Sequence, residues 1–209
     1  MVPSKEDMHD ALVLRQGKEL TEKFEKTTVA ICGLGGLGSN IAISLARAGI
    51  GKLILIDFDI VDVTNLHRQQ YKASQVGMTK AEAIYENLLE IAPYTTYETH
   101  NIKLTEDNIY ELLKDADIIC EAFDKAEQKA MLNNTVLTTF KDKYLVSASG
   151  MAGMDDPNII TTRKITSRFY LCGDGISDVN DNISLVAPRV MLCAAHEAHT
   201  VLRIIQNNM

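Results

Sequence analysis

The stretch that decides the fold extends from Val29 to Gln69 and opens with Val29-Ala30-Ile31-Cys32-Gly33-Leu34-Gly35-Gly36-Leu37-Gly38-Ser39. An apolar strand runs directly into a glycine-rich turn, and apolar residues at helical spacing follow it. A second apolar strand, residues 52–56, ends on Asp57-Phe58-Asp59. Strand, glycines, helix, strand and acid in this order predict a βαβ unit that binds a nucleotide.

Each glycine of the turn has an expected purpose. Gly33 allows a tight turn off the strand, Gly35 and its neighbour Gly36 let backbone approach a phosphate, and Gly38 lets the helix pack closely on the sheet. Backbone amides at the start of the helix present positive partial charge to an anion. Asp57 lies 19 residues beyond Gly38, where its carboxylate can accept hydrogen bonds from ribose hydroxyls.

Length and composition indicate an ordinary globular protein. The chain has 209 residues, 46% of them hydrophobic and 23% charged, and we expect one domain over residues 1–209. A net charge of −7 disfavours nucleic acid as the main partner. No apolar run is long enough to span a membrane, so we expect a cytoplasmic protein. The four cysteines form no C-x-x-C pair, which disfavours a disulfide framework or a zinc site.

Strand and helix patterns alternate along most of the chain, which predicts a Rossmann-like α/β fold with a doubly wound, mostly parallel sheet. We expect an N-terminal helix over 5–24, a nucleotide-binding core over 28–150, and an antiparallel extension with a final helix over 151–209. Thr79 and Thr105 are placed to open helices, and another helix is expected from Lys125 to Thr139. Pro188 is placed in the first turn of the final helix.

The second half of the central stretch departs from the pattern of a dehydrogenase. It reads Asp57-x-Asp59-x-Val61-x-x-x-Asn65-Leu66-x-Arg68-Gln69, and Gly77-x-x-Lys80 and Asp124 come later. With the glycine turn, this set resembles the ThiF/MoeB/ubiquitin-activating enzyme superfamily, whose members adenylate the C-terminal glycine of a small ubiquitin-like protein. The short length and the segment 171–175 look most like the small ThiF proteins of thiamine biosynthesis.

The chemistry of such a reaction can be argued from charge. A C-terminal carboxylate has a pKa of about 3.5, is already ionised at pH 7, and needs no general base to attack a phosphate. The obstacle is the approach of an anion to a polyanion, so the site needs cations and a metal ion. Arg68 and Lys80 supply cations, and Asp124, after another strand, can hold Mg²⁺. All three match positions that the family uses at the phosphates of ATP.

The resemblance implies roles for four further residues. Asn65 and Gln69 would position the phosphates and the ribose, and Asp59 would lie beside the adenosine. Arg15 matches an arginine that, in bacterial members of the family, reaches across a dimer interface to the phosphates. The resemblance therefore implies a homodimer with shared sites.

Simpler interpretations compete for several of these residues. Asp124 is also placed to cap the helix that follows it, and Arg15 is nearly as well explained as a surface ion pair. Cys172 lies in a stretch that looks like a loop, and it is a possible covalent sulfur site. A structural role is favoured for Cys172, because the neighbouring Asp174 would raise the pKa of its thiol. His196 and His199 have the wrong spacing for a zinc-hydrolase motif and indicate a polar helix face.

The main departure from the family is the missing zinc site. Many ThiF and MoeB relatives carry two C-x-x-C pairs after the sheet, and this chain has none, so no zinc is expected. No added sulfur-transfer domain is seen, which implies that a separate protein donates sulfur. The expected function is therefore Mg·ATP-dependent adenylation of the C-terminal glycine of a ThiS-like sulfur carrier, in the synthesis of the thiamine thiazole.

Three alternatives stay open at this point. The same chemistry could act on a MoaD-like carrier or, as in a tRNA threonylcarbamoyladenosine dehydratase, on a tRNA. An NAD-binding oxidoreductase lacks an evident Tyr-x-x-x-Lys or histidine-based pair for hydride transfer. A catalytically silent module that binds a ubiquitin-like tail would have been free to lose Arg68, Lys80 and Asp124.

Overall fold

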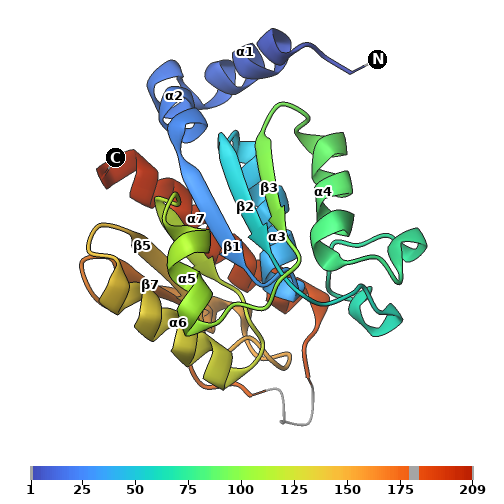
Figure 1. Ribbon diagram of the computed structural model, residues 1–209, viewed down its shortest axis with the longest axis vertical. Helices are drawn as coiled ribbons and strands as arrows, with labels where there is room; N and C mark the ends of the chain where they lie inside the picture. Colours follow the sequence, from blue (N-terminus) through green and yellow to red (C-terminus); the bar gives the residue numbers. More distant parts are fainter. Residues whose placement is uncertain (1, 179–183, 209) are drawn as a thin grey trace.

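One sheet organises the parts of the chain that the computed structural model describes, residues 2–178 and 184–208. Within those residues it has seven strands in the order β3-β2-β1-β4-β5-β7-β6 (Figure 1). The strands are β1 (Thr28–Cys32), β2 (Lys52–Ile56), β3 (Thr96–His100), β4 (Ile118–Glu121), β5 (Tyr144–Ala148), β6 (Thr161–Lys164) and β7 (Phe169–Gly173). All neighbours pair in parallel except β6 and β7. The predicted Rossmann-like, mostly parallel sheet is confirmed.

Helices cover both faces of the sheet (Figure 1). They are α1 (Lys5–Gln16), α2 (Lys18–Lys26), α3 (Gly36–Ala48), α4 (Lys80–Ile91), α5 (Glu106–Leu113), α6 (Ala126–Thr139) and α7 (Ala187–Asn208). Three short 3₁₀ turns, η1 (Val63–Asn65), η2 (Ala73–Gln75) and η3 (Pro157–Ile159), lie in the connections. Helices α3, α4 and α7 pack on one face, and α5 and α6 pack on the other. In the described parts of the chain, no helix has both the length and the apolar character needed to cross a membrane.

The strands form because their residues are apolar on both faces. In β1, Val29 and Ile31 join the cluster beneath α3 and α7, whereas Ala30 and Cys32 join the cluster beneath α5 and α6. All four side chains are fully buried. Such continuous apolar strands are typical of parallel sheets with helices on both faces.

The prediction of one continuous helix over 5–24 is wrong, because two helices, α1 and α2, form there. Gly17 adopts φ 87° and ψ 151° between α1 and α2, a left-handed φ that ends the first helix. Helix α1 has no buried residue, whereas α2 buries Thr21 and Phe24 against the body of the fold. The charged and apolar periodicity continues through both helices, which is why the break is not evident from the pattern.

The C-terminal region adds two strands to the sheet. Strand β7 runs parallel to β5, with Leu145 opposite Phe169, and only β6 at the edge is antiparallel. Cys172 lies inside β7, so the prediction of a loop around it is wrong. Helix α7 begins at Ala187 with Pro188 in its first turn, as predicted. Residues 179–183 and 209 of the predicted extension lie outside the described residues.

The order of the strands creates a crevice at one end of the sheet. Strands β1 and β4 are neighbours, and the chain winds outward from this pair in opposite directions. The turn after β1 is bound to the end of β2, since Gly33 N donates to Ile56 O at 2.8 Å. The turn after β4 is bound to the end of β1, since Ala122 N donates to Cys32 O at 2.8 Å. Ligands of open α/β sheets bind at such a switch point, beyond the carboxyl ends of the strands.

Candidate active site

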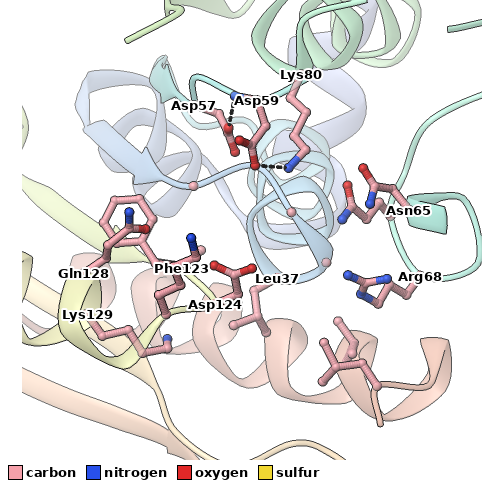
Figure 2. Close-up of a pocket in the computed structure, with 18 of the residues that line it drawn as sticks. Leu37, Asp57, Asp59, Asn65, Arg68, Lys80, Phe123, Asp124, Gln128 and Lys129 are labelled. Carbon is pink, nitrogen blue, oxygen red and sulfur yellow. Dashed lines mark hydrogen bonds and ion pairs between the residues drawn. The ribbon is translucent and has the colours of Figure 1, made fainter. Parts of the chain in front are cut away.

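A cavity of about 580 Å³ opens at this switch point (Figure 2). Ten residues predicted to form the site line it: Gly33, Gly35, Gly36, Asp57, Asp59, Asn65, Arg68, Gln69, Lys80 and Asp124. Figure 2 shows that the side chains come from the turns after β1, β2 and β4 and from the start of α4. The structure therefore brings together in one place residues that are up to 91 positions apart in the sequence (Asp124 − Gly33).

The turn after β1 leaves no room for side chains at two glycines. Gly33 has φ 95°, and a Cβ there would lie 2.8 Å from Ala122 O. At Gly38 a Cβ would lie 1.8 Å from Gly33 O, so the helix contacts its own preceding turn. Helix α3 starts after Gly35, and no side chain caps it. Its first amides are therefore available to an anion in the cavity.

Asp57 connects the end of β2 to the glycine turn after β1, residues 33–38 (the phosphate turn). It is 7% exposed and accepts hydrogen bonds from Leu34 N at 2.6 Å and from Asp59 N at 2.8 Å. Burial raises the pKa of Asp57, and the nearby Lys80 and these hydrogen bonds act in the opposite direction. The carboxylate thus holds the phosphate turn against the end of β2.

Lys80 enters the cavity from the first position of α4, where Thr79 caps the helix. Its ammonium group donates to Asp59 Oδ2 at 2.8 Å, and its side chain is only 8% exposed. The Asp59 side chain is half exposed. The structure therefore holds one buried cation beside the phosphate turn, paired with an acid that faces the cavity.

Arg68 and Gln69 carry polar atoms with no partner. Arg68 Nη1 donates to Thr64 O at 3.2 Å, but Arg68 Nε and Gln69 Oε1 are buried and find no hydrogen-bond partner among the described residues. Burial lowers the pKa of Arg68, and Asp124 across the cavity opposes that shift. Both residues line the cavity, and a ligand there that supplies an acceptor and a donor would satisfy these two atoms.

The Asp124 carboxylate is open to the cavity. Within the described residues, no hydrogen bond or ion pair involves it, and the residue is exposed. The prediction that Asp124 also caps the next helix is wrong, since the N-cap of α6 is Lys125 and no side chain caps it. Figure 2 shows Asp124 between the phosphate turn and the helix that follows β4. A carboxylate without partners at this place suits a hard divalent cation.

Arg15 does not reach this cavity within one chain. It is exposed on α1 and lines a different cavity of about 880 Å³, whose other walls include Gly51 and Thr96. Those two residues lie at the amino ends of β2 and β3, the opposite edge of the sheet. The chain alone therefore does not assemble Arg15 with Arg68 and Lys80.

Cys172 does not line the cavity. Its side chain is 1% exposed, and its nearest polar groups are the hydroxyls of Thr162 and Thr200. Burial, together with the charge of Glu197, raises the pKa of the thiol to about 12. The expected cause, Asp174, is not the one that the structure shows. A thiol of this kind is a poor nucleophile at neutral pH.

The prediction of a polar face on the final helix is wrong at Glu197. Its side chain is fully buried, and neither of its oxygens has a hydrogen-bond partner in the described parts of the chain. Burial raises its pKa well above the ordinary value. His196 is partly buried and lies 3.0 Å from the Thr162 hydroxyl through Nδ1, and His199 is exposed. Residues 2–178 and 184–208 contain no group of three or more histidine, cysteine or acidic side chains that could hold a metal ion.

An apolar wall of the cavity was missed in the sequence. It consists of Phe58, Ile60, Ile102, Leu104 and Phe123. Phe58 and Ile60 are 47% and 57% exposed, which is unusual for large apolar side chains that flank a buried acid. Their alternation with Asp57 and Asp59 was the available signal, since it places apolar side chains beside carboxylates at the end of a strand.

Comparison with known proteins agrees with this geometry. The ThiF family model matches residues 9–208. Adenylyltransferase and sulfurtransferase MOCS3 of Aedes aegypti is 38% identical over 130 residues, 62% of this chain and 29% of that protein. Ubiquitin-like modifier-activating enzyme 5 of Caenorhabditis elegans is 43% identical over 84 residues, 40% of this chain and 20% of that protein. The chain thus spans less than a third of the length of these relatives.

Solved structures share the fold. The crystal structure of E. coli tRNA N6-threonylcarbamoyladenosine dehydratase, TcdA, in complex with ATP superposes with a TM-score of 0.86 and 22% identity, covering 99% of this chain and 97% of that one. E. coli MccB superposes with a TM-score of 0.69 and 22% identity, covering 89% and 58%. With a family match over residues 9–208 and the glycine turn, cations and acid in one cavity, this chain belongs to the ThiF family.

Proposed function

We propose that this protein is an adenylyltransferase that uses Mg·ATP to adenylate the C-terminal glycine of a ThiS-like sulfur carrier, with release of pyrophosphate. The observation that carries the proposal is the pair of unsatisfied buried atoms, Arg68 Nε and Gln69 Oε1, beside the uncapped start of α3. A polyphosphate with an attached ribose offers the acceptor and the donor that these atoms lack. The ATP complex of TcdA, which shares the fold, supports the choice of nucleotide.

The cavity has a suitable place for each part of ATP. The apolar wall with Phe58 and Ile60 would hold the base, and Asp57 and Asp59 would accept from the ribose hydroxyls. The turn after β1 and the first amides of α3 would hold the phosphates. Asn65 and Gln69 would position the phosphates and ribose from the opposite side.

The reaction needs charge neutralisation more than proton transfer. One oxygen of the carrier carboxylate attacks the α-phosphorus of ATP, the bond to the bridging oxygen breaks, and pyrophosphate leaves with that electron pair. Arg68 and Lys80 would neutralise the charge that accumulates on the phosphate oxygens. Lys80 can do so by exchanging Asp59 for phosphate, because its ammonium group is already held at the cavity wall.

Asp124 is the residue that would hold a magnesium ion at the phosphates. The fit is chemical, because the carboxylate faces the cavity and has no partner of its own within residues 2–178 and 184–208. When bound, Mg²⁺ would supply the positive charge that lets a carboxylate approach the α-phosphate. The chain's part is to keep the Asp124 carboxylate at the correct side of the phosphates.

The identity of the molecule that is adenylated is the more specific part of the proposal. Relatives named adenylyltransferase and sulfurtransferase support a ubiquitin-fold carrier, and a separate protein would then donate sulfur to the acyl-adenylate. A tRNA-borne acceptor, as the name of TcdA suggests for that protein, is the second candidate, since the two chains share a fold along almost their whole length. The net charge of −7 favours the protein carrier.

Pyrophosphate exchange tests the proposal. The purified protein is given Mg·ATP, labelled pyrophosphate and, in turn, carriers that end in Gly-Gly. We expect exchange with the ThiS-like carrier, and we expect Asp124→Ala and Arg68→Ala each to lower its rate by roughly 100-fold or more, since each removes charge stabilisation. Exchange with a MoaD-like carrier alone would move the proposal to that acceptor. Nucleotide binding with no exchange for any carrier would overturn it.

A further inference from the structure

A buried carboxylate lies directly behind the turn that carries Asp124. Glu121, the last residue of β4, is fully buried and lines no part of the cavity. Its Oε1 accepts from Phe123 N at 2.8 Å, and both of its oxygens accept from Lys129 Nζ, at 3.1 Å and 3.0 Å. The Ser147 hydroxyl donates to Oε2. Three donors from three places in the fold thus converge on one carboxylate.

Two of these donors connect β4 to helix α6 and to strand β5. Lys129 comes from α6, which lies above the strand, and Ser147 comes from the adjacent strand β5. Asn133, one turn further along α6, donates to the Ser147 hydroxyl at 3.2 Å. A buried charge is tolerated only when it is paired and hydrogen-bonded, so this arrangement holds as a unit. The start of α6 is thereby attached to the sheet.

The Glu121 carboxylate holds the backbone of the turn from behind. The amide that it binds belongs to Phe123, the residue directly before Asp124. On its other side the turn contacts the phosphate turn, because a Cβ on Gly33 would lie 2.8 Å from Ala122 O and 3.0 Å from the Phe123 ring. The backbone of residues 122–123 is therefore fixed from two sides.

The side chain of Asp124 has no such support. Among the described residues nothing hydrogen-bonds to its carboxylate, and the charge of Arg68 acts on it only across the cavity, so its position depends chiefly on the backbone of the turn. Any displacement of the turn would move the carboxylate by a similar distance. A side chain that binds a metal ion directly must be held closely in position, because even a small displacement of it weakens metal binding strongly.

We propose that Glu121 and Lys129 are positioning residues that hold the turn so that Asp124 presents its carboxylate to the divalent cation of Mg·ATP. The inference rests on the proposed function in one respect, the metal role of Asp124. It adds a second layer to the site: a lysine–glutamate pair that contacts neither nucleotide nor metal sets the affinity for the metal. Lys129 lines the cavity with its side chain 20% exposed, but its ammonium group is directed to Glu121.

Calorimetric titration of ATP binding, first in EDTA and then at increasing Mg²⁺, separates positioning from direct contact. Lys129→Met should bind ATP in EDTA as the wild type does, which also shows that it is folded. It should need roughly 10-fold more Mg²⁺ for the metal-dependent gain in affinity, since a displaced ligand costs that much in metal affinity. Lys129→Arg keeps a cation that can donate to both oxygens of Glu121, and it should stay within about twofold of the wild type.

A matched control and a reference variant complete the experiment. Lys114→Met breaks another lysine–glutamate pair, with Glu111 at 2.6 Å on the surface of α5, and should change nothing. Asp124→Asn removes the proposed metal ligand itself, so it shows how large the complete loss of the Mg²⁺-dependent gain in ATP affinity is. The positioning role is overturned, and the metal role of Asp124 survives, if Asp124→Asn raises the Mg²⁺ requirement and Lys129→Met does not. The positioning role is also overturned if Lys129→Met lowers the affinity for ATP as much in EDTA as in Mg²⁺. If Asp124→Asn leaves the requirement unchanged, the metal role in the proposed function fails and the positioning role fails with it.

Discussion

The charged side chains of the cavity differ in the hydrogen bonds and ion pairs that they already make. Asp57 has both oxygens bound to backbone amides, so it shapes the phosphate turn even before a nucleotide binds. Lys80 is paired with Asp59, whereas Asp124 makes no hydrogen bond or ion pair among the described residues, and its charge acts on Arg68 across the cavity. Substitution of Asp57 should therefore damage folding as well as binding, whereas substitution of Asp124 should leave folding intact and damage metal binding and catalysis.

Cys172 provides a prediction at the same scale. With its pKa raised to about 12 by burial and the charge of Glu197, the thiol is almost entirely protonated at neutral pH. Iodoacetamide at pH 7.5 should therefore fail to label Cys172 in the folded protein and should label it rapidly in urea. Mass spectrometry of tryptic peptides measures both.

A second measurement addresses the covalent role directly. Cys172→Ala should retain at least about half of the pyrophosphate exchange of the wild type, because the residue lies outside the cavity and a buried small substitution costs stability first. Rapid labelling of the native thiol, or the loss of sulfur transfer with intact exchange in the variant, would restore the sulfur site that the sequence suggested.

At the scale of elements, one ion pair joins the end of β7 to the start of α7. Arg189 Nη2 donates to Asp174 Oδ2 at 2.6 Å, and the two side chains are 4% and 2% exposed. Asp174 also accepts from Ile176 N and Ser177 N, and Arg189 donates to Asp155 O. Burial would raise the pKa of Asp174, but these hydrogen bonds lower it to about 2. The pair attaches α7 to the wall of the cavity formed after β5.

This pair predicts how stability depends on pH. Because the folded pKa of about 2 lies below the ordinary 3.8, Asp174 stabilises the fold fully above about pH 5 and loses this contribution as the pH falls toward 2. The shift corresponds to about 2 kcal/mol. Asp174→Asn should lower the free energy of unfolding by about that amount at pH 7 and by roughly half as much at pH 3. Urea unfolding at the two pH values measures the difference.

Asp142→Asn is the control for this measurement, since Asp142 is exposed and makes no ion pair in the described parts of the chain. It should leave unfolding unchanged at both pH values. An Asp174→Asn penalty that stays constant from pH 7 to pH 3 would show that the side chain acts through shape and hydrogen bonds rather than through its charge.

Elements with one strong periodic signal were predictable from the sequence. The parallel strands are continuous apolar runs, and the acids after them are at the carboxyl ends, where any parallel sheet places its site. The break at Gly17 was not predictable, because apolar residues keep helical spacing on both sides of it. The parallel pairing of β7 with β5 depends on contacts between distant segments, and the role of Glu121 depends on Lys129 and Ser147 meeting it in space.

At the scale of the whole molecule, Arg15 and the cavity lie at opposite ends of the strands. Helix α1, which carries Arg15, lies beyond the amino ends (Figure 1), and the cavity residues follow the carboxyl ends. Within one chain, Arg15 has no route to the phosphates. A role for it in catalysis therefore requires a second copy of the chain, arranged so that α1 of one protomer approaches the cavity of the other. The homodimer that the family resemblance implies stays a proposal that can be tested by mixing variants.

Mixing inactive variants tests the shared site. Arg15→Ala and Asp124→Ala should each be inactive alone. After joint refolding in equal amounts, about half of the dimers are mixed, and each mixed dimer has one intact site of two, so about a quarter of the wild-type exchange should return. Arg47→Ala is the matched control, because Arg47 lines the same cavity as Arg15 and should not be needed. Full activity of Arg15→Ala alone, or a mixture that stays inactive, would exclude the shared site.

The switch point between β1 and β4 also divides the cavity by position along the chain. One side comes from residues 33–104, and the opposite side comes mostly from residues after β4, including Asp124, Lys125 and Met151. Recombination between β3 and β4 would therefore exchange one wall and keep the other. A chimera of two family members joined there would take the glycine turn, Arg68 and Lys80 from one parent and Asp124 from the other. Such a chimera would assemble one site from two parents, provided that α3 and α7 still pack together.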